Sequence, residues 1–331
     1  MVRARSVWFA APRSVELRTI ELPPLQKDQV LVRTSFSGIS AGTELLAYRG
    51  ELDPEMAVDE TIGALGGTFR YPFQYGYSCF GVVEESRSSL DVGQTVFAFH
   101  PHQSHFVADA AALVVLDGIE GRVATLFPLV ETALQITLDA GPLYGERIVV
   151  FGLGAVGALT ALLLSRTGAR VLGVDPRPWR AGVLKDLALE TVAPDDLRAA
   201  LTVHGRQESV PLIVEASGSP DALRTGLDLL AHEGTALVAS WYGTKEVPLP
   251  LGQHFHRRRL TIRSSQVSTI PAHLGDRWDA DRRRRVVVTL LGELPLGVFA
   301  THVFPVTEVA AAFAAIDEGR EGVVHAALGY G

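Results

Sequence analysis

The chain is predicted to fold as an α/β protein in which a doubly wound parallel sheet is joined to a second, β-rich module. From Arg147 onward, short apolar runs alternate with helical segments, and such alternation builds a parallel sheet covered on both faces. Up to Gly118 the chain instead consists of short β runs separated by turns, which is typical of an all-β module.

Length and composition indicate a globular protein of two domains. The chain has 331 residues, of which 47% are hydrophobic and 20% charged, as in ordinary soluble domains. A formal net charge of −7 supplies no basic field for nucleic acid or anionic lipid. We see no run of about 20 apolar residues and no signal peptide. We therefore expect a cytoplasmic protein that binds a small molecule, without nucleic acid or membrane partners.

The N-terminal module is predicted from six β runs, and its single cysteine limits its chemistry. The runs are 6–11, 14–22, 29–39, 80–86, 94–101 and 113–118. Because Cys79 is the only cysteine, an internal disulfide and a thiolate-rich zinc site are both excluded. Cys79 lies in an apolar string, which favours a buried core thiol over a reactive thiolate. Residues 120–140 then show the three- and four-residue apolar spacing of a helix.

A glycine-rich turn at 152–157 is the strongest functional signal. The apolar run 147–151 leads into Gly152-Leu153-Gly154-Ala155-Val156-Gly157, and a helix follows. Gly152 permits the tight turn, Gly154 lets the backbone approach a pyrophosphate, and Gly157 lets the helix pack on the strand. With Ala155 and Val156 opening the helix, the N-terminal N–H groups are free for phosphates. This context of strand, turn and helix predicts a Rossmann-type dinucleotide site.

The cofactor is predicted to be NAD, with NADP left open. Asp175 falls about 20 residues after the turn, where a carboxylate accepts hydrogen bonds from ribose hydroxyls and repels a 2′-phosphate. Arg177 partly favours NADP, whereas Arg180 is compatible with NAD. Further cofactor contacts are expected at the carboxyl ends of later strands. These residues are Ser217, Gly218, Ser240, Trp241 and Ser265.

The remaining elements complete a parallel sheet that is predicted to have six strands, five of which are assigned to sequence runs, and return the chain to the first module. Strands are expected at 148–152, 171–175, 211–218, 235–243 and 260–268, and helices at 156–166, 177–188, 195–204 and 220–231. Beyond 268 we expect a helix at 283–291, a β run at 299–306, a helix at 307–317 and a strand at 322–330. The catalytic, substrate-binding domain is expected at 1–120 and 270–331, and the dinucleotide-binding domain at 121–269.

Over nearly its whole length the chain resembles the medium-chain dehydrogenase/reductase family. The resemblance is carried by the turn 37–40, the segment 72–83, the glycine turn, the loop 215–220 and the strand-helix 304–318. It implies a Rossmann domain plus a GroES-like catalytic domain. The chain looks most similar to zinc-lacking relatives of threonine and sorbitol dehydrogenases. The string SGISAGTE also resembles, more weakly, the bacteriochlorophyllide a dehydrogenase branch.

The residues at the family's zinc-ligand positions differ from zinc ligands. Ser40 stands where zinc enzymes of the family carry cysteine, Gly76-Tyr77-Ser78 replaces Gly-His-Glu, and Phe127 replaces a glutamate. Zinc requires thiolate, imidazole or carboxylate ligands. We therefore expect no catalytic zinc, and the cysteine-rich lobe that holds a structural zinc is also absent from the sequence.

Without a Lewis acid, hydrogen-bond donors or a general acid must polarise the substrate oxygen. Tyr77 is the first candidate, although an aromatic residue in this string also suits core packing. Ser40 and Thr43 lie on the turn that in the family faces the reacting carbon, where they relay a proton or cap the turn. By resemblance, Glu44 is a structural acid in a polar network.

Three histidines within six residues form a second polar cluster. His100, His102 and His105 suggest a metal site, but no acidic or thiol ligand accompanies them. His102 is retained as a candidate substrate contact or acid/base residue.

The sequence favours a zinc-independent, NAD(H)-dependent oxidoreductase that interconverts a hydroxyl and a carbonyl on a fairly large organic substrate. Two alternatives stay open: an NADPH-dependent enone or quinone reductase, and a catalytically silent nucleotide-binding protein. A homodimer is expected through the last Rossmann strand, 260–264, because an apolar edge strand is a template for pairing. Four aromatic residues line a substrate pocket or fill a core: Tyr48, Phe73, Tyr75 and Trp278.

Overall fold

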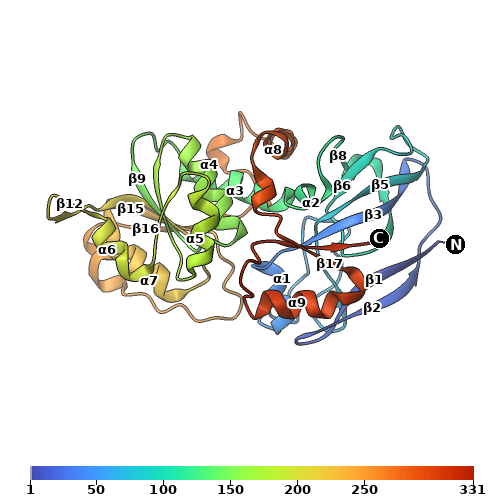
Figure 1. The fold of residues 1–331 in the computed structure, drawn as a ribbon, viewed down its shortest axis with the longest axis horizontal. Coiled ribbons are helices and arrows are strands. Elements are labelled where there is room, and N and C mark those ends of the chain that lie inside the picture. Colours follow the sequence, from blue (N-terminus) through green and yellow to red (C-terminus); the bar gives the residue numbers. More distant parts are fainter. Residues whose placement is uncertain (1) are drawn as a thin grey trace. The chain divides into compact units, whose positions relative to one another are not determined.

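A computed structural model describes residues 2–331, and these residues form two compact units. Unit 1 contains the chain up to residue 128 together with 288–331, and unit 2 contains 129–287. Two helices, α3 (Phe127–Ala140) and α8 (Ala280–Glu293), each run through a boundary between the units in sequence. Figure 1 follows the chain from the blue strands of unit 1 through the green and yellow elements of unit 2 to the red C-terminal strands.

Unit 2 is built on a six-stranded sheet in which every neighbouring pair is parallel. The spatial order is β11 (Glu190–Val192), β10 (Arg170–Val174), β9 (Arg147–Phe151), β14 (Val210–Glu215), β15 (Leu230–Val238) and β16 (Thr261–Ser264). The strand order reverses between β9 and β14. Such a switch point leaves a crevice at the carboxyl ends of the strands, where open α/β sheets bind their ligands.

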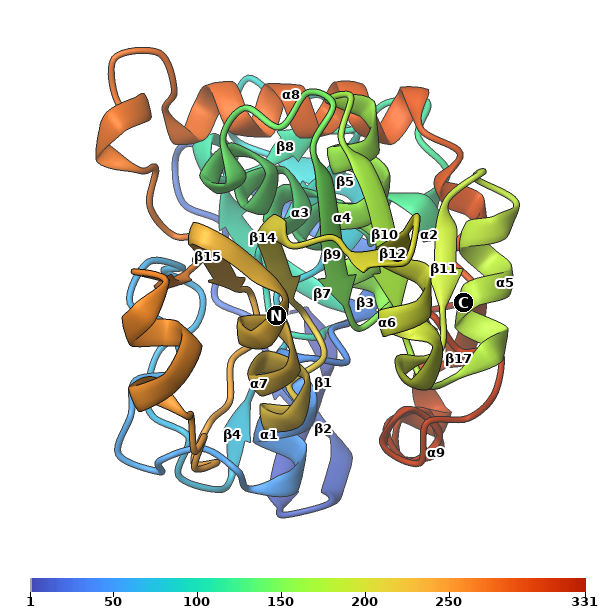
Figure 2. The same ribbon diagram turned by 90° about the vertical axis from the view of Figure 1, so that its left-hand side faces the viewer.

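Both faces of this sheet are covered, as the continuous apolar strands require. Along β9, Ile148 and Val150 pack in one cluster with α3 and α4 (Ala155–Arg166). Val149 and Phe151 pack in the other cluster with α6 (Leu197–Ala200) and α7 (Pro220–Leu229). Figure 2 shows the sheet between these helices. The predicted doubly wound fold is therefore confirmed.

Several predicted element limits in unit 2 were wrong. The helix expected at 220–231 is α7, which ends at Leu229, and β15 begins at once at Leu230 and ends at Val238 rather than at 243. The helix expected at 177–188 is α5 (Pro178–Lys185). The sixth strand is the three-residue edge strand β11, whose side chains are not fully buried. A short, half-exposed edge strand carries little apolar pattern, so the sequence gives it a weak signal.

Unit 1 has the expected GroES-like character, with two sheets. The larger sheet has the order β17 (His302–Pro305), β18 (Ala326–Gly329), β3 (Gln29–Ile39), β5 (Cys79–Ser86), β6 (Thr95–Ala98) and β8 (Val114–Val115), and β7 (His105–Asp109) also pairs with β3. The smaller sheet has the order β2 (Ser14–Glu21), β1 (Arg3–Ala11) and β4 (Phe73–Gln74). The C-terminal strands thus return to the N-terminal module, as predicted.

The N-terminal module is not all-β, as the sequence had suggested. It contains α1 (Thr43–Arg49), whose residues from Glu44 to Tyr48 are buried, and a left-handed Gly50 ends the helix. The long helix expected at 120–140 is divided into α2 (Gly121–Ala124) and α3. Pro128 sits in the first turn of α3, a position that favours a new helix start. The last helix, α9 (Val309–Asp317), packs its Phe313 against Phe9 of β1.

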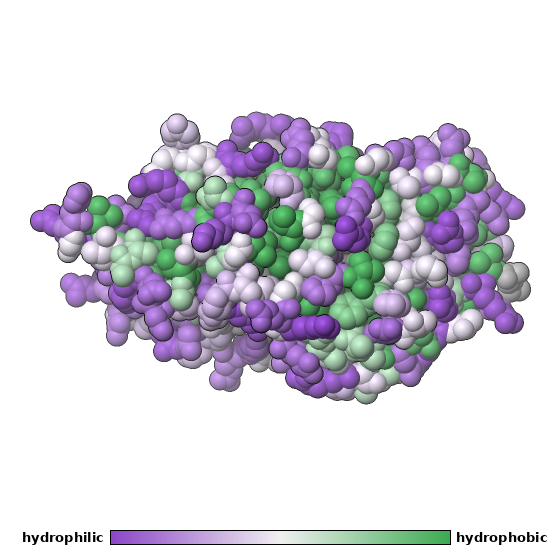
Figure 3. All heavy atoms as spheres, viewed as in Figure 1, coloured by the Kyte–Doolittle hydropathy of each residue, from purple (hydrophilic) through white to green (hydrophobic). Residues whose placement is uncertain are grey.

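The face shown in Figure 3 carries both kinds of side chain, with hydrophilic ones gathered toward its edges and hydrophobic areas between them. The hairpin of β12 (Thr202–Val203) and β13 (Arg206–Gln207), at the left of that view, is exposed on both strands. Within residues 2–331, no helix combines the length and the apolar character needed to cross a membrane.

Candidate active site

The glycine turn of unit 2 has the close backbone packing that its sequence predicts. Gly152 has a φ of +85°, and a Cβ there would lie 2.6 Å from Cα of Ser217. At Gly157 a Cβ would collide with the carbonyl oxygen of Gly152. Gly154 caps α4, in which Ala155 and Val156 form the first turn. The turn therefore presents the free N–H groups of a helix N-terminus at the carboxyl end of β9.

Asp175 is buried beside this turn, with only 4% of its surface exposed. Its Oδ2 accepts hydrogen bonds from the Leu153 backbone N–H at 2.8 Å and from Nη1 of Arg180 at 3.1 Å. Its Oδ1 accepts from the Arg177 backbone N–H at 2.8 Å. Three hydrogen-bond donors thus surround this buried carboxylate and replace the water that burial removes from it. The structure thus brings together the predicted glycine turn, Asp175 and Arg180.

A second buried carboxylate, Glu215, organises the loop after β14 and was not predicted as a site residue. Its Oε1 accepts from the backbone N–H groups of Ser217 at 2.6 Å and Gly218 at 2.9 Å. Its Oε2 accepts from the Tyr242 hydroxyl at 2.8 Å, and burial together with the Glu215 charge raises the pKa of Tyr242. An acid at the end of the apolar strand PLIVE was the signal that could have identified it.

Three other predicted cofactor contacts lie at the ends of β15 and β16. Ser240 accepts a hydrogen bond from the Gly218 N–H at 2.9 Å, so these two predicted residues meet. Trp241, next to it, is 41% exposed. Ser265 donates to Asp139 of α3 at 2.6 Å.

In unit 1, the hydroxyl groups of Ser40, Thr43 and Tyr77 come together. The side chains of Ser40 and Thr43 lie near the Tyr77 hydroxyl and lower its pKa as hydrogen-bonding groups do. Burial and the nearby charge of Glu44 raise the pKa of Tyr77 to about 12, although the two neighbouring hydroxyls act in the opposite direction. A phenol with this pKa stays protonated at neutral pH and is available as a hydrogen-bond donor. These three residues form the hydroxyl cluster.

His102 lies in a buried network next to this cluster. Its Nε2 hydrogen-bonds Oε2 of Glu44 at 2.8 Å, and its Nδ1 hydrogen-bonds Oγ of Ser37 at 2.7 Å. All three side chains are fully buried. Oε1 of Glu44 accepts from the Ser40 backbone N–H at 2.8 Å, so one carboxylate joins the histidine to the turn that bears the hydroxyl cluster.

Gly76 provides the space for the His102 ring. It has a φ of +105°, which favours glycine, and a Cβ there would lie 2.6 Å from Cδ2 of His102. The His102 backbone is also fixed, since its N–H donates to the Tyr75 carbonyl at 3.2 Å and its carbonyl accepts from Val7 at 3.0 Å.

The other candidate side chains serve the core or separate contacts. His100 stacks on Phe106 at 4.1 Å, and burial lowers its pKa to about 4. His105 hydrogen-bonds Ser104 through Nδ1 at 3.2 Å. The sulfur of Cys79 is buried and burial raises its pKa. The aromatic residues Tyr48, Phe73 and Tyr75 belong to a buried cluster, whereas Trp278 lies against Arg282 with 4.6 Å from its ring centroid to the guanidinium.

The side chains at the family's zinc-ligand positions do not form a zinc-binding set. Ser40 and Tyr77 offer neutral hydroxyls, and Phe127 is buried against Phe97 with ring centroids 4.4 Å apart. Zinc sites in proteins use thiolate, imidazole and carboxylate donors. Across residues 2–331, the structure contains no group of three or more His, Cys, Asp or Glu side chains arranged to hold a metal ion.

Known proteins resemble this chain in sequence and in fold. The family described as zinc-binding dehydrogenase matches residues 155–279. The D-guloside 3-dehydrogenase of Escherichia coli K12 is 27% identical over 293 residues, which cover 82% of this chain and 83% of the relative. The 2-dehydro-3-deoxy-L-galactonate 5-dehydrogenase of Pseudoalteromonas atlantica is 24% identical over 321 residues, covering 90% and 91%.

The fold itself recurs in solved dehydrogenases. An alcohol dehydrogenase from Escherichia coli CFT073, crystallised with its cofactor NADH, superposes with a TM-score of 0.77 at 16% identity, and the match covers 99% of each chain. Sequence relatives, the matched family segment and the two folded units agree. The chain is an oxidoreductase of the alcohol dehydrogenase type, and over most of its length it is similar to medium-chain dehydrogenases.

Proposed function

We propose that this protein is a zinc-independent, NAD(H)-dependent dehydrogenase that interconverts a hydroxyl and a carbonyl group on an organic substrate. The observation that carries the proposal is the hydroxyl cluster of Ser40, Thr43 and Tyr77, which occupies the turn and the segment where zinc-dependent relatives carry metal ligands. A protonated phenol supported by two hydroxyls is a hydrogen-bond donor for a substrate oxygen.

The residues of unit 2 fit a bound dinucleotide. Nε of Arg180 is buried and has no hydrogen-bond partner among the described residues. It is therefore available next to Asp175 to donate a hydrogen bond to a bound cofactor. The glycine turn supplies backbone N–H groups for a pyrophosphate, and the Asp175 carboxylate suits ribose hydroxyls. When bound, NAD⁺ accepts a hydride from the carbon that bears the substrate hydroxyl.

The substrate is proposed to be a polyhydroxylated compound with a secondary hydroxyl group. Two relatives that span most of this chain are named as dehydrogenases of sugar derivatives, a D-guloside and a 2-dehydro-3-deoxy-L-galactonate. The aromatic residues Tyr48, Phe73 and Tyr75 fill the core of unit 1 and therefore give no support to an apolar pocket. Specificity is better attributed to polar contacts.

Tyr77→Phe is expected to lower kcat by about 10²–10³, because the variant keeps the ring and loses the donor. The melting temperature should stay near that of the wild type. Tyr77→Ala should in addition destabilise the fold by up to about 3–5 kcal/mol, since the ring packs on the core of unit 1. Steady-state kinetics and thermal unfolding of both variants test this.

Tyr71→Phe is the matched control, because the Tyr71 hydroxyl donates to the Ala47 carbonyl outside the hydroxyl cluster. Its turnover should equal that of the wild type. A fully active Tyr77→Phe enzyme would contradict the assignment and transfer the role of donor to His102.

Asp175→Ser should shift cofactor preference toward NADP(H) by about tenfold or more, equivalent to about 1.4 kcal/mol. Removal of the carboxylate removes both the ribose acceptor and the repulsion of a 2′-phosphate. Calorimetric titration of NAD⁺ and NADP⁺ into both proteins measures the shift. The exposed Asp186, replaced by Ser, is the control, and equal affinities for the two cofactors in the wild type would refute the claim.

The purified protein is expected to contain substoichiometric zinc and to keep its activity in the presence of chelators. The reason is that Ser40 and Tyr77 offer neutral hydroxyls and Phe127 a phenyl ring, whereas zinc binds thiolate, imidazole or carboxylate ligands. Elemental analysis after purification without chelators provides the measurement. One firmly held zinc per chain, with activity lost on its removal, would show that another set of residues binds the metal.

We also propose a homodimer joined through β16, the edge strand of the unit 2 sheet. The backbone groups on the free side of an edge strand are a ready template for pairing with a second copy. Light scattering at micromolar concentration should give twice the mass of one chain. A monomer at that concentration would exclude this assembly.

A further inference from the structure

A chain of buried hydrogen bonds connects Glu44, which lies at the candidate active site, to Tyr330 near the C-terminus. From Glu44 Oε2 it runs to His102 at 2.8 Å, from His102 to Ser37 at 2.7 Å, and from Ser37 to the hydroxyl of Tyr330 at 2.9 Å. Glu44, His102 and Ser37 each have no exposed surface, whereas Tyr330 is 8% exposed.

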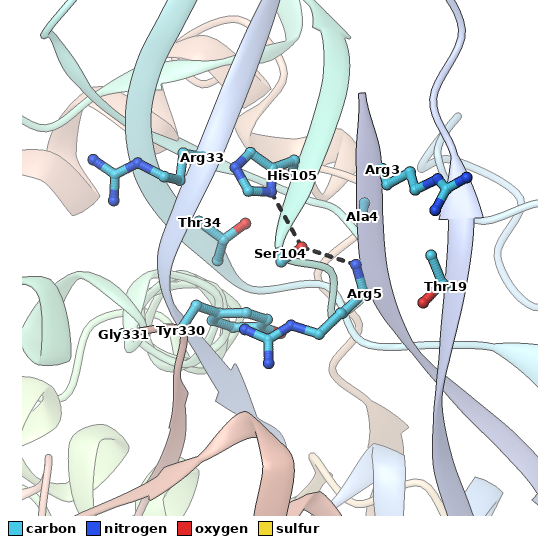
Figure 4. A pocket seen from close by; sticks show the side chains of 10 residues that line it. All are labelled: Arg3, Ala4, Arg5, Thr19, Arg33, Thr34, Ser104, His105, Tyr330 and Gly331. Atoms are coloured by element: carbon cyan, nitrogen blue, oxygen red, sulfur yellow. Dashed lines mark hydrogen bonds between the residues drawn. The ribbon is translucent and has the colours of Figure 1, made fainter. Parts of the chain in front are cut away.

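The outer end of this chain lies at a surface pocket of unit 1. Tyr330 lines a pocket of about 590 Å³ together with Arg3, Arg5, Ser104 and His105. Figure 4 shows the Arg5 side chain extending beside the Tyr330 ring, and the Arg5 charge acts against the burial that raises the pKa of Tyr330. The pocket is basic, so it concentrates anionic bases from solution near the tyrosine.

The inner end lies at the hydroxyl cluster. Glu44 accepts from the Ser40 backbone N–H, and its charge contributes to the raised pKa of Tyr77. The hydrogen bond to Ser40 therefore places the carboxylate at the turn that carries two of the three cluster residues. No other titratable side chain hydrogen-bonds Glu44 in the described residues except His102.

We propose that Glu44, His102, Ser37 and Tyr330 conduct protons between the hydroxyl cluster and the surface pocket. The proposal rests on the dehydrogenase function above, in which each oxidised hydroxyl loses one hydride and one proton. The dinucleotide takes the hydride, and the proton is transferred along this route to solvent.

From Glu44 to Tyr330, each step is balanced by a donor and an acceptor atom that hydrogen-bond each other. In the outward direction, Glu44 takes the proton from the cluster and passes it to Nε2 of His102, while Nδ1–H gives its proton to Ser37. Ser37 passes its hydroxyl proton to Tyr330, and Tyr330 releases one to a base in the pocket. The inward direction, needed for carbonyl reduction, uses the opposite tautomer of His102.

A purely structural role explains only part of this arrangement. The His102 ring is already positioned by Gly76, by its backbone bonds to Tyr75 and Val7, and by Glu44. The Tyr330 hydroxyl, which lies beyond Ser37, adds little to the orientation of the ring. It is, however, the link that brings the network to the pocket.

Hydrogen exchange of the His102 ring N–H tests the route without substrate or cofactor. With ¹⁵N-labelled histidine, NMR should show exchange with water slowed by about tenfold or more in Tyr330→Phe and Ser37→Ala, given that positioned proton donors contribute about 10²–10⁴-fold to transfer rates. Tyr71→Phe, the matched hydroxyl deletion outside the network, should exchange as the wild type does. Unchanged or faster exchange in both route variants would overturn the proposal.

Pre-steady-state oxidation supplies the second measurement. A pH indicator follows proton release while absorbance follows the reduced dinucleotide, and in Tyr330→Phe proton release should lag behind hydride transfer. Release in step with hydride transfer would overturn the route. Failure of the wild type to oxidise any hydroxyl would refute the proposed function instead, and the exchange result would remain interpretable.

Discussion

Three buried carboxylates hold the functional loops of this protein. A carboxylate removed from water is tolerated only when donors replace its hydration, and here most of the donors are backbone N–H groups of the loops themselves. Glu44 takes the N–H of Ser40, Asp175 takes those of Leu153 and Arg177, and Glu215 takes those of Ser217 and Gly218. Because each unmet charge would cost several kcal/mol, these bonds restrict the loops to one conformation.

The glycines add steric constraints that couple neighbouring loops. Gly152 packs its backbone on Ser217, so the first turn of unit 2 fits only if the Glu215 loop keeps its shape. In unit 1, Gly76 packs against His102, and the same histidine holds Glu44. In both units a close backbone contact and a buried charge support each other. A side chain at either glycine would therefore disturb a hydrogen-bonded carboxylate as well as the local packing.

The sequence predicted those parts of the site that are local along the chain. The glycine turn, the following helix and Asp175 lie within one βαβ unit, so their spacing alone implied their proximity. The network around His102, in contrast, joins residues that are far apart in the sequence. Ser37 and Tyr330 are 293 residues apart and Glu44 and His102 are 58 apart, so only the pairing of β18 with β3 and the return of the loop at His102 bring them together. No local pattern encodes these contacts.

Two aromatic residues show that closeness in sequence does not predict a shared role. Tyr75 and Tyr77 are two residues apart and have similar side chains, yet Tyr75 is 3% exposed in the core, while Tyr77 meets Ser40 and Thr43. Burial raises the pKa of both phenols, so burial alone does not make a donor for catalysis. Glu44 raises the pKa of both phenols, so what distinguishes Tyr77 is its position beside the hydroxyls of Ser40 and Thr43. The Glu44 charge and burial together keep the Tyr77 phenol protonated, and the neighbouring hydroxyls of Ser40 and Thr43 set it apart as the donor that a substrate oxygen needs.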